Sequence, residues 1–254
     1  MKENNIKYFK ILNHYHADFS SSKFNSTADF QNSEFNSTAD FLSSKFNGDT
    51  NFMSSKFREV ALFGDSRFKI THFAGAHFDK VAQFDDSQFI GITSFNSSIF
   101  KEDALFENTT FEDLLYLTRT KYDKLYIRWA GIEKGLGYDE SAYQQLIENF
   151  KKLGYFNDAD NSYYSFRNGN RASLSFPRWQ MDWILMALYG YGTRPERPIY
   201  WAIVIIVICG AVIYLTNGIQ KSNDKISIPE ALLYSTTALI SGARSIGVFV
   251  SEPS

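Results

Sequence analysis

Phenylalanine recurs through the first half of the chain at intervals of five or six residues. The two intervals mostly alternate, so that the underlying period is eleven, and only between Phe63 and Phe78 do three fives follow one another. Two positions before each of these rings stands Ala, Ser or Thr, without one exception in eighteen repeats. The rings are Phe19, Phe24, Phe30, Phe35, Phe41, Phe46, Phe52, Phe57, Phe63, Phe68, Phe73, Phe78, Phe84, Phe89, Phe95, Phe100, Phe106 and Phe111.

This spacing predicts short extended edges that turn repeatedly. Residues i and i−2 of an extended segment lie on the same side, so the small residue and the ring face a common interior while the residue between them faces water. About two residues then turn each corner, and these are rich in Ser, Asn and Gly, which suit turns. A helix would scatter the rings around its axis. Because each edge buries too little alone, successive coils must stack into a solenoid.

The pattern resembles the pentapeptide-repeat family, whose unit reads small residue, polar residue, Phe or Leu, and two further residues. Ala17-Asp18-Phe19, Ala28-Asp29-Phe30 and Ala39-Asp40-Phe41 carry the resemblance. It implies a mainly β fold, a right-handed quadrilateral β-helix with about four coils stacked ~4.8 Å apart. Each buried ring contributes about 2 kcal/mol. The expected core ladder is Phe30, Phe41, Phe52, Phe63, Phe73, Phe84, Phe95 and Phe106.

The solenoid domain is predicted to span residues 1–117. The apolar residues before the first repeat are expected to cap one end of the stack, because a solenoid end exposes apolar surface and strand edges. Leu114, Leu115 and Leu117 are expected to close the other end.

Residues 118–177 form a predicted helical connector. Asp139 followed by Glu140 signals a helix start, and Gly154 signals its stop. A second helix fits residues 157–167, and the two together predict an αα-hairpin.

Residues 178–254 are predicted to form a membrane domain. The seventeen residues 199–215 carry no charge and would span ~26 Å as a helix, which predicts a transmembrane span over 198–216. The Trp-rich stretch before it suits a helix at a membrane surface, the alternative being a buried soluble helix. Arg194 and Arg197 precede the span, so the solenoid is expected in the cytoplasm.

Residues 229–250 predict a re-entrant pore-type segment. Pro229 and Glu230 open a helix that ends near Ile240, and a flexible stretch follows, which is tolerated at membrane depth only beside protein or water. The region resembles the first span and pore loop of two-span, tetrameric potassium channels, as fused to pentapeptide repeats in some proteins. The filter motif Thr-x-Gly-Tyr-Gly is absent here, and the expected second span does not follow before Ser254. The pore-loop candidates are Ser241, Gly242, Ala243, Arg244, Ser245 and Gly247.

Arg244 bears on selectivity. Four copies around a pore would form a ring of positive charge that favours anions. Alternatively, its side chain extends sideways to lipid head groups or pairs with Glu252.

Composition excludes several function classes. The chain has a net charge of −2, with −5 over residues 1–115, and its single cysteine, Cys209, allows no internal disulfide. A metal pair at His14 and His16 lacks an obvious Cys, Asp or Glu cluster to complete it. Neither a phosphate-binding loop nor a metal or catalytic motif is found, so the sequence predicts no enzyme, no cofactor and no metal.

The sequence therefore predicts a membrane protein, a subunit of an ion-channel-like assembly that carries a solenoid. The expected partners are the lipid bilayer and further copies of the chain, a tetramer if channel-like, and no nucleic acid. The alternatives are a membrane-tethered interaction scaffold that does not conduct, or a DNA-mimic topoisomerase inhibitor. A mimic needs a continuous acidic face, which Lys45, Lys56, Arg67 and Lys80 interrupt. The protein partner of the solenoid is not identified by the sequence.

Overall fold

A computed structural model of the 254-residue chain describes residues 16–216 and 227–250, without the side chains of 172 and 242–250. Two compact units are present, Met1–Ala172 and Ser173–Ser254. The predicted N-terminal cap and residues 217–226, which follow the predicted span, lie outside the described residues.

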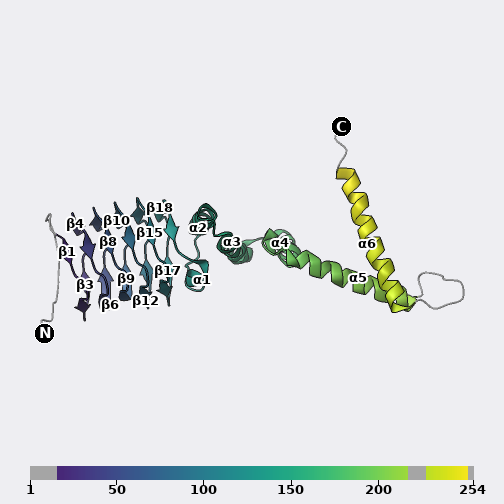
Figure 1. Cartoon of the computed structure of the whole chain (residues 1–254), viewed down its shortest axis with the longest axis horizontal. Helices are drawn as coiled ribbons and strands as arrows, with labels where there is room; N and C mark the ends of the chain where they lie inside the picture. The colour runs from purple at the N-terminus through teal and green to yellow at the C-terminus, as the bar shows by residue number, and fades with distance from the viewer. Residues whose placement is uncertain (1–15, 217–226, 251–254) are drawn as a thin grey trace. The chain divides into compact units, whose positions relative to one another are not determined.

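The first unit is a β-solenoid of short parallel strands, which run in Figure 1 from β1 in purple to β18 in teal. The strands form four rows along the stack. Row 1 comprises β1 (Ala17–Asp18), β5 (Ala39–Asp40), β8 (Ala61–Leu62), β11 (Ala82–Gln83), β15 (Ala104–Leu105) and β19 (Leu125–Tyr126). Row 2 comprises β2 (Lys23–Phe24), the first parts of β6 (Lys45–Asn51) and β9 (Arg67–His72), β12 (Gln88–Phe89) and β16 (Thr110–Phe111). Row 3 comprises β3 (Ala28–Asp29), the second parts of β6 and β9, β13 (Thr93–Ser94) and β17 (Leu115–Tyr116). Row 4 comprises β4 (Glu34–Phe35), β7 (Lys56–Phe57), β10 (His77–Phe78), β14 (Ile99–Phe100) and β18 (Lys121–Tyr122).

Two kinds of corner alternate around each coil and account for the eleven-residue period. Neighbouring coils pair residues 22 apart, as Ala17 with Ala39, or 21 apart, as Ala61 with Ala82. The corners that follow rows 1 and 3 contain one residue with φ between 53° and 69°, and these corners always give the five-residue step. Asn, Asp, Ser and Gly dominate there because they tolerate this left-handed backbone best. The residues are Ser21, Asn32, Ser43, Ser54, Asp65, Gly75, Asp86, Ser97, Asn108 and Arg119.

The core is a set of stacked phenylalanine ladders. Rings one coil apart lie 4.6–5.0 Å between centroids with their planes within 9° of parallel. The ladders that end rows 1 and 3 meet edge to face at 5.3–5.6 Å, an arrangement that aromatic quadrupoles favour. The eight rings singled out from the sequence belong to these two central ladders, and each is at most 4% exposed.

The small residues before the rings have two distinct roles. After the left-handed corners, a buried hydroxyl donates a hydrogen bond to a Phe carbonyl of the preceding coil, as Ser66 Oγ does to Phe41 O at 2.7 Å. Seven such bonds of 2.6–2.8 Å are present, and Ala76 interrupts the series. At the other corners Ala or Thr fills the position, so the role of each small residue depends on the corner that precedes it.

The solenoid continues past residue 117, where the sequence placed its end, and makes about five turns rather than four. Leu117, Tyr122 and Ile127 take the places that Phe holds in earlier coils, since the interior requires bulk and not specifically a Phe ring. Leu114 is 39% exposed and does not cover the end of the stack, whereas Leu115 is buried. Because aliphatic side chains fill less volume than Phe, a small apolar cavity remains beside these last coils.

Helices cover the end of the stack. They are α1 (Trp129–Ile132), α2 (Glu140–Lys152) and α3 (Phe156–Asn170). The helices predicted here are present, and Asp139 caps α2, its Oδ1 accepting the Ala142 N–H at 2.9 Å. The hydroxyl of Ser141 and this N–H lower the pKa of Asp139. Trp129 is 2% exposed and belongs to the same hydrophobic cluster as the Phe ladders, so the solenoid core continues into the helices.

Asn149 on α2 closes the edge of the last strand in row 1. Its side chain is buried, accepts the Leu125 N–H at 3.0 Å and donates to the Leu125 carbonyl at 2.8 Å. The amide thereby satisfies the same two groups that another coil would have paired. An edge that would otherwise expose free strand groups is blocked by one side chain.

The second unit is helical. It contains α4 (Arg178–Tyr189), the 3-10 turn η2 (Gly190–Gly192), α5 (Glu196–Thr216) and α6 (Ile228–Val250), and a further turn, η1 (Arg171–Ser173), leads into it. The predicted short helix and flexible loop are replaced by the single helix α6, which runs on through residues 241–247. After Pro229 no proline interrupts this helix, and the hydroxyl of Ser241 donates to the Thr237 carbonyl one turn earlier at 2.7 Å, as serine does within a helix.

Candidate functional site

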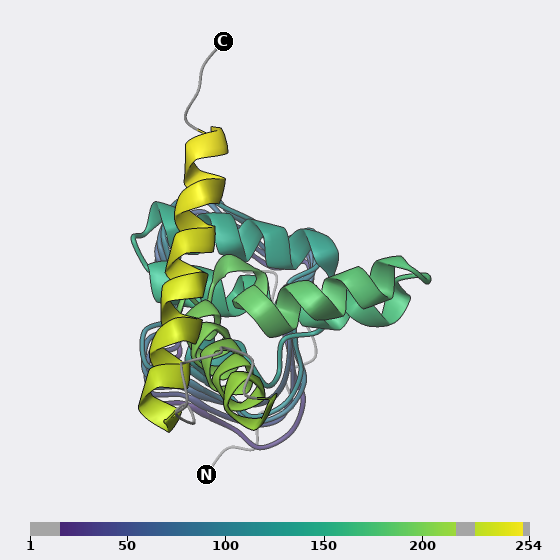
Figure 2. The same cartoon turned by 90° about the vertical axis from the view of Figure 1, so that its right-hand side faces the viewer.

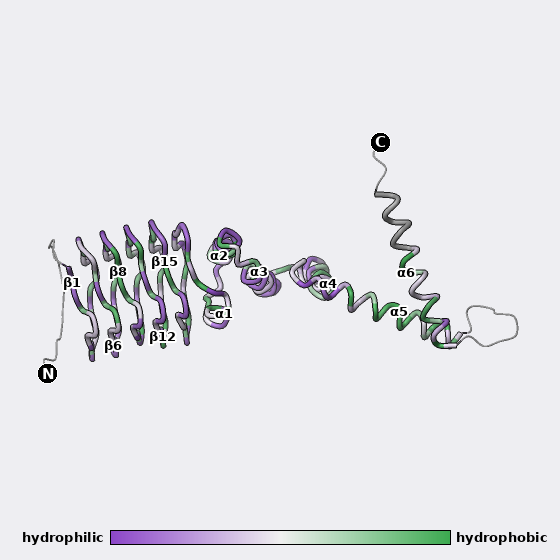
Figure 3. Tube along the Cα trace, in the orientation of Figure 1, coloured by the Kyte–Doolittle hydropathy of each residue, from purple (hydrophilic) through white to green (hydrophobic). Residues whose placement is uncertain are grey.

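Helix α5 carries the strongest functional signal in the second unit. It is 21 residues long and, among the described residues, is the one helix long and apolar enough to cross a membrane. Only 6% of its apolar window is buried, so it is unlike the core helix of a soluble protein. Figure 3 shows the helix coloured as hydrophobic over most of its length. Ile203, Ile205, Val207 and Ile208 are each at least 45% exposed.

Helices α5 and α6 approach closely through small residues. Gly210 is buried against Leu232, and a Cβ at Gly210 would lie 2.8 Å from Leu232 Cδ2. Ala231 and Ser235 are also buried on α6. Small residues that let two helix backbones approach are typical of helix pairs in membranes, although such contacts are not confined to them.

The pore-loop candidates lie on α6 as parts of a helix. Ser241 is exposed, and the side chains of Gly242, Ala243, Arg244, Ser245 and Gly247 fall outside the described set. The structure therefore brings these residues together only as one helical segment and leaves the role of Arg244 as a prediction.

The junction of α4 and α5 contains a polar contact that the sequence did not indicate. Asp182 is 3% exposed on α4 and accepts a 2.5 Å hydrogen bond from the Tyr191 hydroxyl. Trp201 donates from Nε1 to the Ala187 carbonyl at 3.0 Å, and Arg197 donates to the Met186 carbonyl. A Tyr nine residues after an Asp is no recognisable motif, so only the folded junction pairs them.

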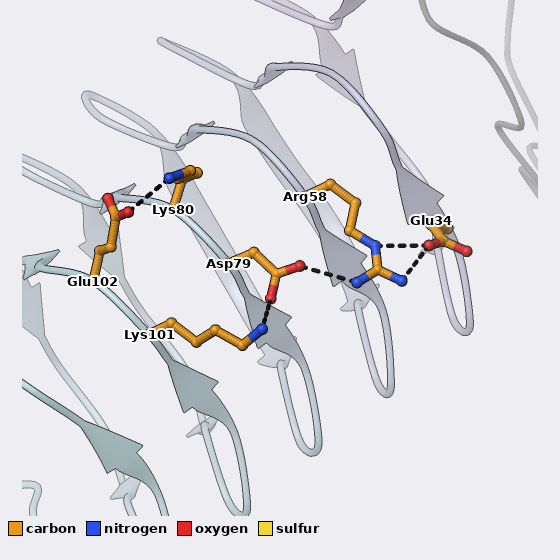
Figure 4. A network of polar contacts seen from close by, with 6 residues as sticks. All are labelled: Glu34, Arg58, Asp79, Lys80, Lys101 and Glu102. Carbon is orange, nitrogen blue, oxygen red and sulfur yellow. Dashed lines mark hydrogen bonds and ion pairs between the residues drawn. The ribbon is translucent and has the colours of Figure 1, made fainter.

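Alternating charges form a checkerboard at the corner between rows 4 and 1. Asp79 receives Arg58 at 3.0 Å and Lys101 at 2.7 Å, while Lys80 binds Glu102 at 2.9 Å (Figure 4). The Lys101 and Arg58 donors hold the pKa of Asp79 below its usual value. Each of four successive coils contributes one adjacent cation and anion in alternating order, so these pairs balance, and Asp103 leaves the corner with a net charge of −1. The pairs in chain order are Arg58 and Glu59, Asp79 and Lys80, Lys101 and Glu102, and Asp123 and Lys124.

The face of row 2 has the opposite character, because its charges are segregated. Lys23, Lys45 and Arg67 stand at successive outward positions of the first three coils. Asp65 and Asp86 occupy the corner leading into this face in the third and fourth coils. We call the outward positions of row 2, the residue after each of its rings, and this corner the row-2 face.

Residues near the start of the solenoid could hold a divalent cation. The ligand atoms of His16, Asp18 and Asp40 lie within 4.8 Å of one another, and His16 Nε2 is 3.8 Å from Asp40 Oδ2. The sequence did not predict this cluster, because Asp40 lies near His16 only when the second coil stacks on the first. Asp18 and Asp40 also accept hydrogen bonds from the Ser20 and Leu42 N–H groups, which orients both carboxylates. His16 and Asp18 are exposed and Asp40 is half-buried, and exposed acidic clusters without a metal are common.

Comparison with family models agrees with the repeat. A model described as pentapeptide repeats (9 copies) matches residues 73–121, which correspond to part of the solenoid. Neither a curated protein nor a solved structure matches the chain. The chain thus contains pentapeptide repeats, which are wound into a β-solenoid of about five turns and followed by helices, one of them apolar.

Proposed function

We propose that the protein is a membrane-tethered interaction scaffold, in which α5 anchors the chain in a bilayer and the solenoid presents its outer faces to partners. The exposed apolar surface of α5 is the observation that carries this proposal. Left in water, a contiguous apolar surface of this size would drive association, and a bilayer core removes it from water. Trp201 and Tyr214 near the two ends suit the interfaces.

The solenoid is well suited to binding rather than to chemistry. Its interior is filled by stacked rings, so its shape is rigid and its outward side chains can vary without loss of the fold. In the proposal the winding is right-handed and four-sided, and α2 and α3 form a hairpin, as the family resemblance implies. Arg194 and Arg197 before α5 favour a cytoplasmic solenoid.

A channel subunit is the second candidate. The close packing of α5 on α6 at Gly210 supports it, because a helix pair of this kind could assemble with further copies into a tetramer. The continuous α6 in place of a pore loop weighs against it. The DNA-mimic alternative is disfavoured by the alternating cations of the checkerboard and by the cations of the row-2 face, which interrupt any continuous acidic surface.

Membrane fractionation tests the anchor. Replacing Ile205 and Ile208 together by Arg should cost about 5–7 kcal/mol of insertion free energy and move the chain from carbonate-washed membranes to the supernatant. The matched control replaces Ile92 and Leu114, which are exposed on the solenoid, by Arg and should leave the chain in the membrane. Wild-type protein in the supernatant would refute the anchor.

Ion flux into liposomes distinguishes the two candidates. A scaffold should give no flux above that of empty liposomes, whereas a channel should give flux that Gly210→Leu reduces by separating α5 from α6. Reproducible, single-channel conductance from the purified chain would overturn the scaffold proposal in favour of the channel.

A further inference from the structure

The row-2 face carries an unbalanced column of cations in its first three coils. Lys23 pairs in register with Lys45, and Lys45 with Arg67, so three positive side chains stand directly above one another. Lys69 adds a fourth beside them, and all four are exposed. Like charges opposite one another on neighbouring strands are destabilising. Within the described residues none of the four has a salt bridge, unlike the paired cations of Figure 4.

The same face is acidic in its last two coils, and Asp65 adds one acid in the third coil beside Arg67 and Lys69. Asp65 and Asp86 lie at the left-handed corner residues, with Asp85 and Glu107 beside them in the fourth and fifth coils. Hydrogen bonds to the corner backbone orient part of this column, since Asp85 Oδ1 accepts the Glu107 N–H at 2.8 Å. Again no salt bridge is present among these described acids. Along the stack, marked in Figure 1 by β6, β9 and β12, the face changes from basic to acidic.

The two halves have the same repeat and opposite sign. Each is spaced by one coil, the 4.7–4.9 Å that separates the stacked rings of row 2. A two-fold axis lying in the plane of the face, perpendicular to the stack and level with the third coil, superposes the first coil on the fifth and the second on the fourth. A copy turned about this axis would set Lys45 level along the stack with Asp86 of the second copy and Lys23 level with its Glu107. Arg67 in the third coil would be level with Arg67 and Asp65 of the second copy.

We propose that the row-2 face binds the row-2 face of a second copy of this chain, with the two solenoids antiparallel. The acids lie two residues (Asp65, Asp86) or three residues (Asp85, Glu107) to the side of the cation column, roughly 7–10 Å, which extended Lys and Arg side chains span. Such an interface is isologous and closes as a dimer. A continuous polyanion fits poorly, because Asp65, Asp86 and Glu107 would repel it over half of the face. Parallel copies would set like charge against like charge.

The dimer is expected to be weak and sensitive to salt, because exposed ion pairs contribute little each and are screened. Ile92 and Leu114 are 38% and 39% exposed at the far corner of row 2, so they would add apolar contact at the rim. Asp49, in that same corner, is the exception to the basic half. The inference uses residues of the solenoid alone, so it stands or falls independently of the membrane anchor.

Disulfide trapping tests the geometry on the full chain in detergent micelles. In a Cys209→Ser background, Lys45→Cys chains mixed with Gln88→Cys chains should form a heterodimer under mild oxidation at low salt, because the two-fold axis sets residue 45 opposite residue 88 of the same column. The control mixes Lys56→Cys, an exposed lysine of row 4, with Gln88→Cys and should give at least tenfold less product. Equal trapping in both mixtures, or none with Lys45→Cys, would overturn the proposal. Association through the membrane helices would not favour one pair over the other.

Charge reversal provides the second arm. Lys45→Glu and Asp86→Lys should each weaken dimerisation at least tenfold in analytical ultracentrifugation, and the two changes in one chain should restore it to within threefold of wild type. Lys56→Glu, with the same change in charge, should have no effect. Failure of the double change to restore dimers would count against direct pairing of these two residues and so against the proposed register.

Discussion

Removal of the Asn149 amide should unravel the last coil of the solenoid. In the variant Asn149→Leu, the volume is kept but Leu125 N–H and C=O lose their partners, which lie at 3.0 Å and 2.8 Å in the native chain. Leaving a buried polar group unsatisfied costs about 1–3 kcal/mol, so the pair should cost about 3 kcal/mol or more. Because a solenoid is stabilised coil by coil, the loss should appear first as local opening of the end.

Hydrogen–deuterium exchange measures this opening directly. A loss of about 3 kcal/mol corresponds to roughly 100-fold less protection, which we expect at Leu125 and its neighbours on β19 but not on β8, several coils away. The control variant Gln145→Leu changes a partly exposed amide on the same helix and should leave the protection of β19 within threefold of wild type.

The variant Asn149→Asp adds a dependence on pH. A carboxylate can still accept the Leu125 N–H, but it faces the Leu125 carbonyl without a proton and is buried, so its pKa in the folded chain should rise above about 3.9. The folded state then binds the proton more tightly than the unfolded state, and stability should recover as the pH falls from 7 towards 4. Unchanged protection of β19 in both Asn149 variants at pH 7 would refute the idea that this amide closes the stack.

Four further changes can be followed by urea denaturation monitored by circular dichroism. Phe63→Ala should cost about 3–5 kcal/mol, because the ring is fully buried between two stacked neighbours. Ala76→Ser should stabilise by about 0.5–1 kcal/mol, since its hydroxyl can donate to the carbonyl of Phe52 and complete the interrupted series. Thr71→Val should stabilise by about 1 kcal/mol, because the buried Thr71 hydroxyl has no hydrogen-bond partner in the described structure. Asp139→Ala should cost about 1 kcal/mol at pH 7 through loss of the α2 cap, and the deficit should shrink as the pH falls below about 4, because the lowered pKa of Asp139 contributes stability only while the group is ionised. Destabilisation by Ala76→Ser would refute the stabilising role of the buried hydroxyls that donate to Phe carbonyls. Destabilisation by Thr71→Val would show that the Thr71 hydroxyl contributes to stability.

The sequence predicts the repeat because the conformation of each coil depends on residues that are close in the chain. Period two along an edge, turn residues at corners and a ring at every fifth or sixth position depend only on neighbours in the chain, and residues such as Phe52 and Phe84 take the buried places expected of them. The start of α2 at Asp139 and the apolar length of α5 were local signals of the same kind.

The prediction that the solenoid ends at residue 117 was wrong, because the interior requires a large apolar side chain and not specifically Phe. Leu117 and Ile127 continue the coil without the Phe signature, whereas Leu114 points outward although it is equally apolar. The prediction of a flexible loop over 241–247 was wrong because glycine and serine permit a loop but do not require one. The helix α6 continues through these residues.

What the sequence by itself determined is the coil, the helix signals and the apolar segment, because these follow from contacts between residues close in the chain. Only the tertiary structure decided which side chains stand together across coils. The pairing of Arg58 with Asp79, the column of Lys23 and Lys45, and the reach of Asn149 to Leu125 all join residues about 20 or more positions apart. Such partners are set by stacking register, which shifts with every corner of five or six residues and becomes visible only when the coils are closed.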